Sequence, residues 1–93
     1  MSNFPTQYPA YVTAKNGSRK VVFVREGDII VWKRRPEDEN EYTAKVIFIG
    51  GTSVQIRLEK LNGEDIPPRD VSILRGIVKA FREGKDLTEL DND

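Results

Sequence analysis

The sequence contains neither cysteine nor histidine. Without cysteine, the chain offers no disulfide, no thiolate nucleophile and no zinc–thiolate site. Without histidine, it lacks the commonest general acid–base group and the commonest metal ligand. We therefore expect a protein that binds a partner and is not an enzyme, with no cofactor and no metal site.

Only lysine and carboxylate chemistry is left by these two absences. The carboxylates of Glu37–Glu41 and Glu64-Asp65 leave a two-carboxylate site open. Both groups fall in predicted loops, and Glu37–Glu41 lacks the ligand spacing of an EF-hand loop. Surface charge that keeps a sheet edge soluble is the simpler interpretation.

Long apolar runs are also missing. None approaches the roughly 20 residues that span a bilayer, and Met1–Ala10 has neither the charged nor the apolar region of a signal peptide. Hydrophobic residues make up 38% of the chain and charged residues 32%, which is typical of a soluble globular domain. We expect a cytoplasmic protein with one domain over residues 1–85, an acidic tail over 86–93 and no membrane contact.

Charge is balanced over the whole chain but unevenly placed. The net charge is zero, yet residues 1–36 hold seven basic residues and only two acidic ones. Glu37–Glu41 then supplies four acidic residues, and Asp86–Asp93 supplies four more without a base. A basic half beside acidic segments is compatible with nucleic-acid contact, and also with a mixed, solvated surface.

Turn signals divide the chain into short β-rich segments. Asn16-Gly17, Gly50-Gly51 and Asn62-Gly63 are typical of turns between antiparallel strands. The segments around them alternate between apolar and polar residues or are rich in β-branched and aromatic residues. The predicted strands are Tyr11–Lys15, Ser18–Val24, Ile29–Arg34, Tyr42–Ile49 and Ser53–Lys60. Five short strands separated by turns favour a small barrel.

The turns also predict the strand register. A two-residue turn at Asn16-Gly17 would pair Val12 with Val21. A two-residue turn at Gly50-Gly51 would set core residues opposite polar ones, so we predict an odd-length connection or a bulge there. The predicted pairs are then Phe48 with Val54, Val46 with Ile56, and Ala44 with Leu58. This register leaves Ile47 and Ile49 on the outer face of the sheet, where another element should cover them.

A helical stripe is the natural cover for that outer face. The apolar residues of Ile73–Phe81 recur at helical spacing. One interpretation is a helix through the whole segment, and the other is a short last strand over Val71–Leu74 with a helix over Gly76–Glu83. We favour the second. Ile66-Pro67-Pro68, just before this segment, cannot form a central strand because proline has no N–H for the ladder.

Trp32 is followed directly by Lys33, Arg34 and Arg35. Basic residues beside an aromatic ring can hold a phosphate while the ring stacks on a base. In the alternative interpretation, Trp32 packs in the core and the basic residues pair with Glu37–Glu41. The sequence leaves both interpretations open.

Several segments resemble Tudor-type and KOW-type SH3-like barrels. They are Gly27-Asp28-Ile29, Tyr42-Thr43-Ala44-Lys45-Val46, Val54-Gln55-Ile56-Arg57-Leu58, Asn62-Gly63 and the stretch from Ile66 to Leu74. The resemblance implies a mostly-β fold, a small five-stranded SH3-like barrel with a short C-terminal helix packed on it.

The same resemblance bears on the ligand. Tudor domains bind methylated lysine or arginine in an aromatic cage through cation–π attraction. Tyr42 matches one cage aromatic, but the later cage positions fall near Leu58 and Leu61, which are aliphatic, so methyl-ligand recognition does not carry over. KOW modules contact RNA polymerase, ribosomes or RNA, and their central glycine falls at Ala44 here.

Three functions are compatible with this sequence. The first is a protein-interaction module that docks on a larger assembly, as a regulator or inhibitor of nucleic-acid-handling machinery; its motivation is a set of apolar residues outside the inward pattern, namely Ile47, Ile49, Val71, Ile77 and Phe81. The second is direct nucleic-acid binding through Lys15, Arg19, Lys20, Lys33, Arg34, Arg35 and Arg57. The third is a structural assembly subunit. The candidate binding residues are Trp32, Lys33, Arg34, Arg35, Tyr42, Ile47, Ile49, Arg57 and Phe81.

Overall fold

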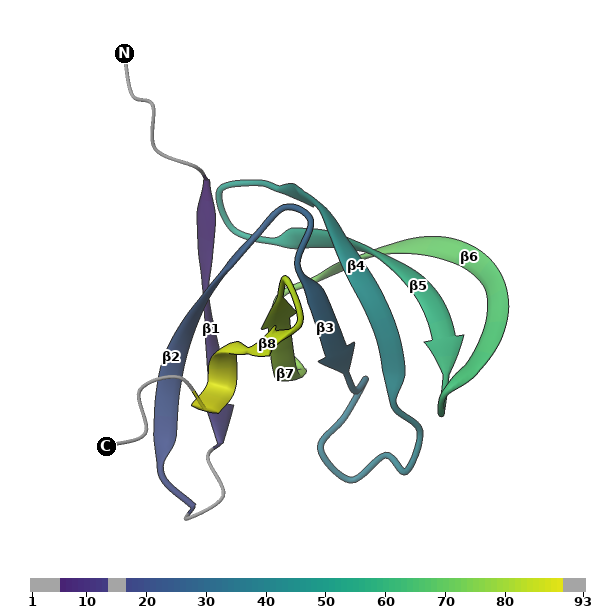
Figure 1. The fold of residues 1–93 in the computed structure, drawn as a ribbon, viewed down its shortest axis with the longest axis horizontal. Helices are drawn as coiled ribbons and strands as arrows, with labels where there is room; N and C mark the ends of the chain where they lie inside the picture. Colours follow the sequence, from purple (N-terminus) through teal and green to yellow (C-terminus); the bar gives the residue numbers. More distant parts are fainter. Residues whose placement is uncertain (1–5, 14–16, 90–93) are drawn as a thin grey trace.

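The computed structural model describes residues 6–13 and 17–89. Within these residues, eight strands form two antiparallel sheets (Figure 1). Their bounds are β1 Gln7–Thr13, β2 Arg19–Arg25, β3 Ile29–Trp32, β4 Tyr42–Ile49, β5 Val54–Leu61, β6 Glu64–Ile73, β7 Ile77–Arg82 and β8 Lys85–Asp86, followed by the 3-10 turn η1 Leu87–Glu89. Strands β1 and β2 form a hairpin of their own, and the other six are ordered β6-β5-β4-β3-β7-β8.

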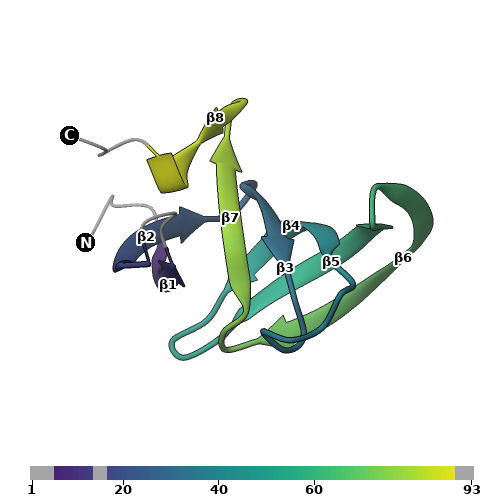
Figure 2. The ribbon, with the colours of Figure 1, turned by 90° about the horizontal axis from the view of Figure 1, so that it is seen from below.

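The core lies between the hairpin and the six-stranded sheet. In Figure 2, β7 runs between the β1–β2 hairpin and the rest of the curved sheet. The hairpin contributes Ala10, Val12, Val22 and Val24 to the core. The sheet contributes Ile30, Trp32, Ala44, Val46, Ile49, Val54, Ile56, Leu58, Ile73, Ile77 and Ala80. Side chains that alternate along each strand therefore meet from two layers.

The predicted five-stranded barrel with a C-terminal helix is wrong. The chain is rich in strand, but among the described residues β6 and β8 lie at opposite ends of the sheet order and do not pair with each other. The hairpin covers the apolar face that closure of a barrel would otherwise have buried. The structure is therefore an open, curved sheet with a two-stranded cover.

The predicted helix over Gly76–Glu83 is wrong because β7 occupies this segment and pairs antiparallel with β3. The pairing sets Ile77 opposite Trp32 and skips Val78, which forms a β-bulge. Beyond the bulge, Ala80 is buried together with Ile77, three residues away. A spacing of three is also the spacing of a helical stripe. The bulge therefore explains why the sequence indicated a helix.

A second bulge changes the register of β4. The pairs Ala44–Leu58 and Val46–Ile56 are confirmed. The ladder then skips Ile47, so that Phe48 pairs with Gln55 and Ile49 with Val54. The predicted pair Phe48–Val54 is wrong, and so is the outward position of Ile49, because Ile49 is in the core and Phe48 is exposed.

The first hairpin differs from its predicted register by one residue. Val12 lies opposite Lys20 and not Val21. Because a slip of one residue exchanges the two faces of a strand, Tyr11, Val21 and Phe23 all point away from the core. Of the predicted turn Asn16-Gly17, Asn16 lies outside the described residues, and so does Lys15, the predicted last residue of the first strand.

The hairpin between β5 and β6 confirms its predicted turn. Asn62 and Gly63 have φ of 52° and 86°, as a type I′ turn requires. Further along β6, the three residues Ile66–Pro68 oppose the single residue Glu59, so the ladder is interrupted where the prolines stand. Strand β6 lies at the sheet edge, which confirms that this segment is not a central strand.

An ion pair between the buried Asp28 and the half-buried Arg82 joins the β2–β3 turn to the end of β7. Asp28 is only 4% exposed. Arg82 donates from Nε and Nη2 to its two carboxylate oxygens at 3.0 and 2.8 Å, and the backbone N–H of Arg25 donates to it at 2.9 Å. The hydrogen bond to Asp28 raises the pKa of Arg82. Arg82 also donates to the carbonyl of Phe23 at 3.0 Å, which ties the hairpin to the six-stranded sheet.

We expect Asp28→Asn to lower the free energy of unfolding by about 2–3 kcal/mol, because it leaves the Arg82 guanidinium without its charged acceptor. Urea unfolding followed by Trp32 fluorescence measures the change. The matched control is Asp70→Asn, which removes the exposed 2.8 Å ion pair with Arg57. Equal losses in the two variants would contradict a special role for the buried pair.

The control pair has its own pH dependence. The hydrogen bond from Arg57 lowers the pKa of Asp70 in the folded state. The stability that the Arg57–Asp70 pair contributes is therefore fully present above the carboxyl pKa of the unfolded chain. It is lost as the pH falls through the lowered pKa of Asp70 in the folded state. We expect Asp70→Asn to have little effect at pH 7, because exposed ion pairs contribute little.

Candidate anion-binding groove

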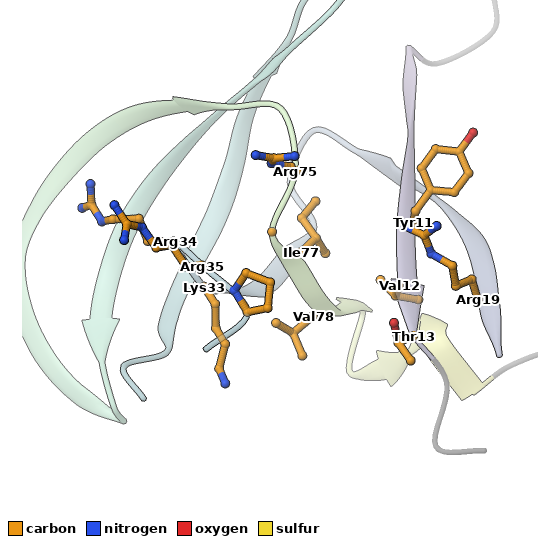
Figure 3. A pocket seen from close by; sticks show the side chains of 12 residues that line it. Tyr11, Val12, Thr13, Arg19, Lys33, Arg34, Arg35, Arg75, Ile77 and Val78 are labelled. Atoms are coloured by element: carbon orange, nitrogen blue, oxygen red, sulfur yellow. The ribbon is translucent and has the colours of Figure 1, made fainter. Parts of the chain in front are cut away.

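A cavity of about 580 Å³ lies between the hairpin, the β3–β4 connection and the turn that joins β6 to β7 (Figure 3). We call it the basic groove. Its lining residues are Tyr11, Val12, Thr13, Arg19, Lys33, Arg34, Arg35, Pro36, Arg75, Gly76, Ile77 and Val78. The volume falls within the range of natural ligand sites, roughly 300–1,000 Å³.

The groove is strongly positive although the chain is neutral. Five lining residues are cationic and none is acidic; the cations are Arg19, Lys33, Arg34, Arg35 and Arg75. Across residues 6–13 and 17–89, the ion pairs engage Arg57, Lys60 and Arg82 and none of these five. The pairing of Lys33–Arg35 with Glu37–Glu41 is therefore not seen. Unneutralised cations around a concave surface attract an anion.

Trp32 supports the groove from the core. It is 7% exposed, which agrees with the interpretation that it packs inside. Its Nε1 donates to the carbonyl of Arg75 at 2.9 Å, and the N–H of Lys33 donates to the carbonyl of Gly76 at 2.9 Å. The guanidinium of Arg34 lies over the indole, 5.7 Å from the ring centroid, at a distance typical of cation–π contact. The buried ring of Trp32 thus contacts two cationic residues from separate segments, Arg34 in the β3–β4 connection and Arg75 in the β6–β7 turn.

The turn that carries Arg75 depends on a glycine. Gly76 has a φ of 105°, a conformation that other residues rarely adopt. A Cβ at this position would collide with the carbonyl oxygen of Lys33 and would lie 2.6 Å from Trp32 Nε1. The close approach of the turn to the end of β3 therefore requires the absence of a side chain.

The opposite wall comes from the hairpin. In Figure 3, Tyr11, Thr13 and Arg19 stand on the hairpin side and Lys33 on the side of the β3–β4 connection, with Ile77 and Val78 of β7 between them. Tyr11 is 65% exposed although it borders the groove. The site therefore combines cations with an aromatic ring and an apolar floor.

The other predicted site residues lie elsewhere. Arg57 pairs with Asp70 on the exposed surface of β5 and β6. Tyr42 packs against Trp32 in a tilted arrangement, with 5.7 Å between the ring centroids. Ile49 is in the core, and Ile47 and Phe81 are half-buried.

Tyr42 also borders a second, smaller cavity of about 300 Å³. Its lining residues are Tyr42, Leu58, Leu61, Ile66, Pro67 and Arg69. The structure thus brings together the residues that the Tudor resemblance placed at the cage, and the wall holds aliphatic residues and Arg69 beside a single aromatic. Cation–π capture needs aromatic faces, so this cavity lacks the chemistry of a methyl-ammonium cage.

The described residues contain no cluster of acidic residues able to hold a metal ion. They also contain no helix long and apolar enough to cross a membrane. Comparison of the chain with family models, curated proteins and solved structures gave no match. The functional argument therefore depends on the groove itself.

Several groove residues were not among the candidates from the sequence, and Tyr11 and Arg75 are the aromatic and the cationic residue among them. The outward direction of Tyr11 depends on the register of the first hairpin, and the predicted register differed from the observed one by one residue. The position of Arg75 in the groove depends on the β6–β7 turn, and this segment was interpreted from the sequence as the approach to a helix. Its one available signal was the neighbouring Gly76, a residue common in turns with positive φ.

We expect Gly76→Ala to destabilise the fold by about 3 kcal/mol or more, because a backbone strain and a steric collision act together. The matched control is Gly84→Ala, at a φ of 82° with nothing within 4 Å of the added Cβ. The control should cost only the strain of the left-handed conformation, about 1–2 kcal/mol. Urea unfolding followed by Trp32 fluorescence measures both, and equal losses would contradict the collision.

Proposed function

We propose that this chain is a non-catalytic nucleic-acid-binding protein that holds the backbone phosphates of a strand in the basic groove. The observation that carries the proposal is the set of five cations around one concave surface that has no acidic lining residue. The neutral chain leaves these charges without carboxylate partners in the described residues, while three other basic residues are paired. Phosphate contacts by lysine and arginine supply most of the affinity of sequence-independent binding.

The spread of the cations favours a chain of phosphates over a single small anion. They come from the hairpin, the β3–β4 connection and the β6–β7 turn, so they line the groove and do not converge on one point. A small anion would be satisfied by two or three of them. The half-buried Val78 on the groove floor suits sugar or base surface between the phosphates.

Docking on a protein assembly, as a regulator or inhibitor of nucleic-acid-handling machinery, stays a prediction, and so does a structural role. The apolar residues that motivated docking are less available than the sequence indicated. Ile49 and Ile77 are in the core, and Ile47, Val71 and Phe81 are half-buried. The groove therefore supports strand binding better than it supports these alternatives.

The test is fluorescence anisotropy with a labelled single-stranded oligonucleotide, titrated between 50 and 200 mM salt. We expect binding that weakens with salt, with a slope of log K against log salt of about −2 to −3.5 if three to five phosphates are neutralised. Absence of binding at 50 mM salt would overturn the proposal.

Charge reversal locates the binding surface. We expect Arg35→Glu combined with Arg75→Glu to weaken binding about tenfold or more and to make the salt slope less steep by about 1.4, the loss of two phosphate contacts. The matched control is Lys45→Glu combined with Lys85→Glu, which changes the net charge equally at exposed positions outside the groove lining. Equal loss in both double variants would assign the effect to overall charge and not to the groove.

A further inference from the structure

The outer surface of the β1–β2 hairpin continues from the groove. We define the hairpin face as Pro9, Tyr11, Val21 and Phe23. Tyr11 lies opposite Val21 and Pro9 opposite Phe23, so all four side chains leave the same side of the ribbon. Phe23 is 53% exposed and Tyr11 is 65% exposed, and Tyr11 also lines the groove. The aromatic surface thus begins at the groove and runs away from it.

Tyr11 and Phe23 are diagonal neighbours across the ladder. Diagonal residues on one face are about 7–8 Å apart, within reach of two aromatic side chains. Arg19, which precedes Val21 on the same side of β2, also lines the groove. The two rings therefore lie beside a cation that belongs to the groove wall, and the described residues of β1 and β2 include no acidic residue.

The size of the hairpin face decides between two kinds of partner. Each strand has seven residues, so the ribbon is roughly 23 Å long and about 10 Å wide, which gives a face of about 230 Å². A stable protein–protein interface buries about 800 Å² on each partner. A nucleobase needs only one exposed ring on which to stack. The face is too small for a standard protein interface and large enough for one or two bases.

We infer that the ligand of the groove is single-stranded, and that bases leaving the groove stack on Tyr11 and Phe23. This inference rests on the proposed function, because the groove holds the phosphates of the same strand. Bases in a duplex are paired and stacked on one another, so their faces cannot reach these rings. The aromatic pair therefore selects an unpaired strand, while the cations alone would accept either form.

The first experiment compares four probes of equal length by fluorescence anisotropy: single-stranded DNA, single-stranded RNA, duplex DNA and an abasic single strand. We expect both natural single strands to bind at least tenfold more tightly than the abasic strand, with the same salt slope, because only the stacking contribution is removed. Preference for DNA or for RNA identifies the source of the strand. Equal binding of the natural and abasic strands, or tighter binding of the duplex, would overturn the inference and leave the groove proposal standing.

The second experiment replaces the rings. We expect Tyr11→Leu to weaken single-strand binding about 5- to 100-fold, the range found for loss of one stacked base, and Phe23→Leu to weaken it by at least fivefold. Tyr11→Phe is the matched control, because it keeps the ring and should keep the affinity. A 2-aminopurine base in the strand should be quenched by the protein and should lose that quenching in Tyr11→Leu.

The outcomes separate the two proposals. If no probe binds at 50 mM salt, both the proposed function and this inference fail. If the strand binds and the leucine variants keep both the affinity and the quenching, the inference alone is overturned. Unchanged urea unfolding of the leucine variants ties the loss to the rings, because both side chains are exposed in the free protein.

Discussion

The contact between Gly76 and the end of β3 is the constraint on which the basic groove depends. The chain leaves β6, turns through a positive φ and passes so close to Trp32 and Lys33 that a Cβ would not fit. Two hydrogen bonds, from Trp32 to the carbonyl of Arg75 and from Lys33 to the carbonyl of Gly76, close the junction. They also set Arg75 beside the cations that follow Trp32. The same contact therefore joins the β6–β7 turn to the end of β3 and assembles one end of the site.

The electrostatics follow from this geometry. A chain with no net charge would attract a polyanion only weakly if its charges were evenly mixed. Here several basic residues are neutralised in pairs, such as Arg82 with Asp28 and Arg57 with Asp70. Five cations without a carboxylate partner among the described residues line one concave surface that has no acidic lining residue, so the local field is positive although the total is zero. Segregation of charge, and not its sum, gives the chain a candidate function.

The local signals in the sequence predicted the middle strands well. The turn signal at Asn62-Gly63 predicted the turn that follows β5. The alternation in β4 and β5, with an odd-length connection or bulge at Gly50-Gly51, predicted two ladder pairs, Ala44–Leu58 and Val46–Ile56, because these strands are close together in the chain. Two errors, the helix predicted in place of β7 and the outward position of Ile49, came where a ladder contains a bulge. The extra residue, Val78 in β7, turned a strand with period two into a pattern with a spacing of three. A helix and a bulged strand are then indistinguishable from the sequence.

In the candidate site, too, local sequence predicted some features and the packing of distant strands decided the others. The sequence by itself determined the run Lys33–Arg35 beside Trp32, the absence of cysteine and histidine, and an overall neutral charge. It could not determine that Trp32 is buried, that Arg75 joins the run, or that Tyr11 and Phe23 point outward. Those facts depend on which strands become neighbours and on the register between them. A shift of the register by one residue moves every side chain of a strand from the core to the solvent or the reverse. Only the tertiary structure decides them. The favoured register is the one that buries the most apolar surface between the hairpin and the sheet, and that amount depends on both layers together.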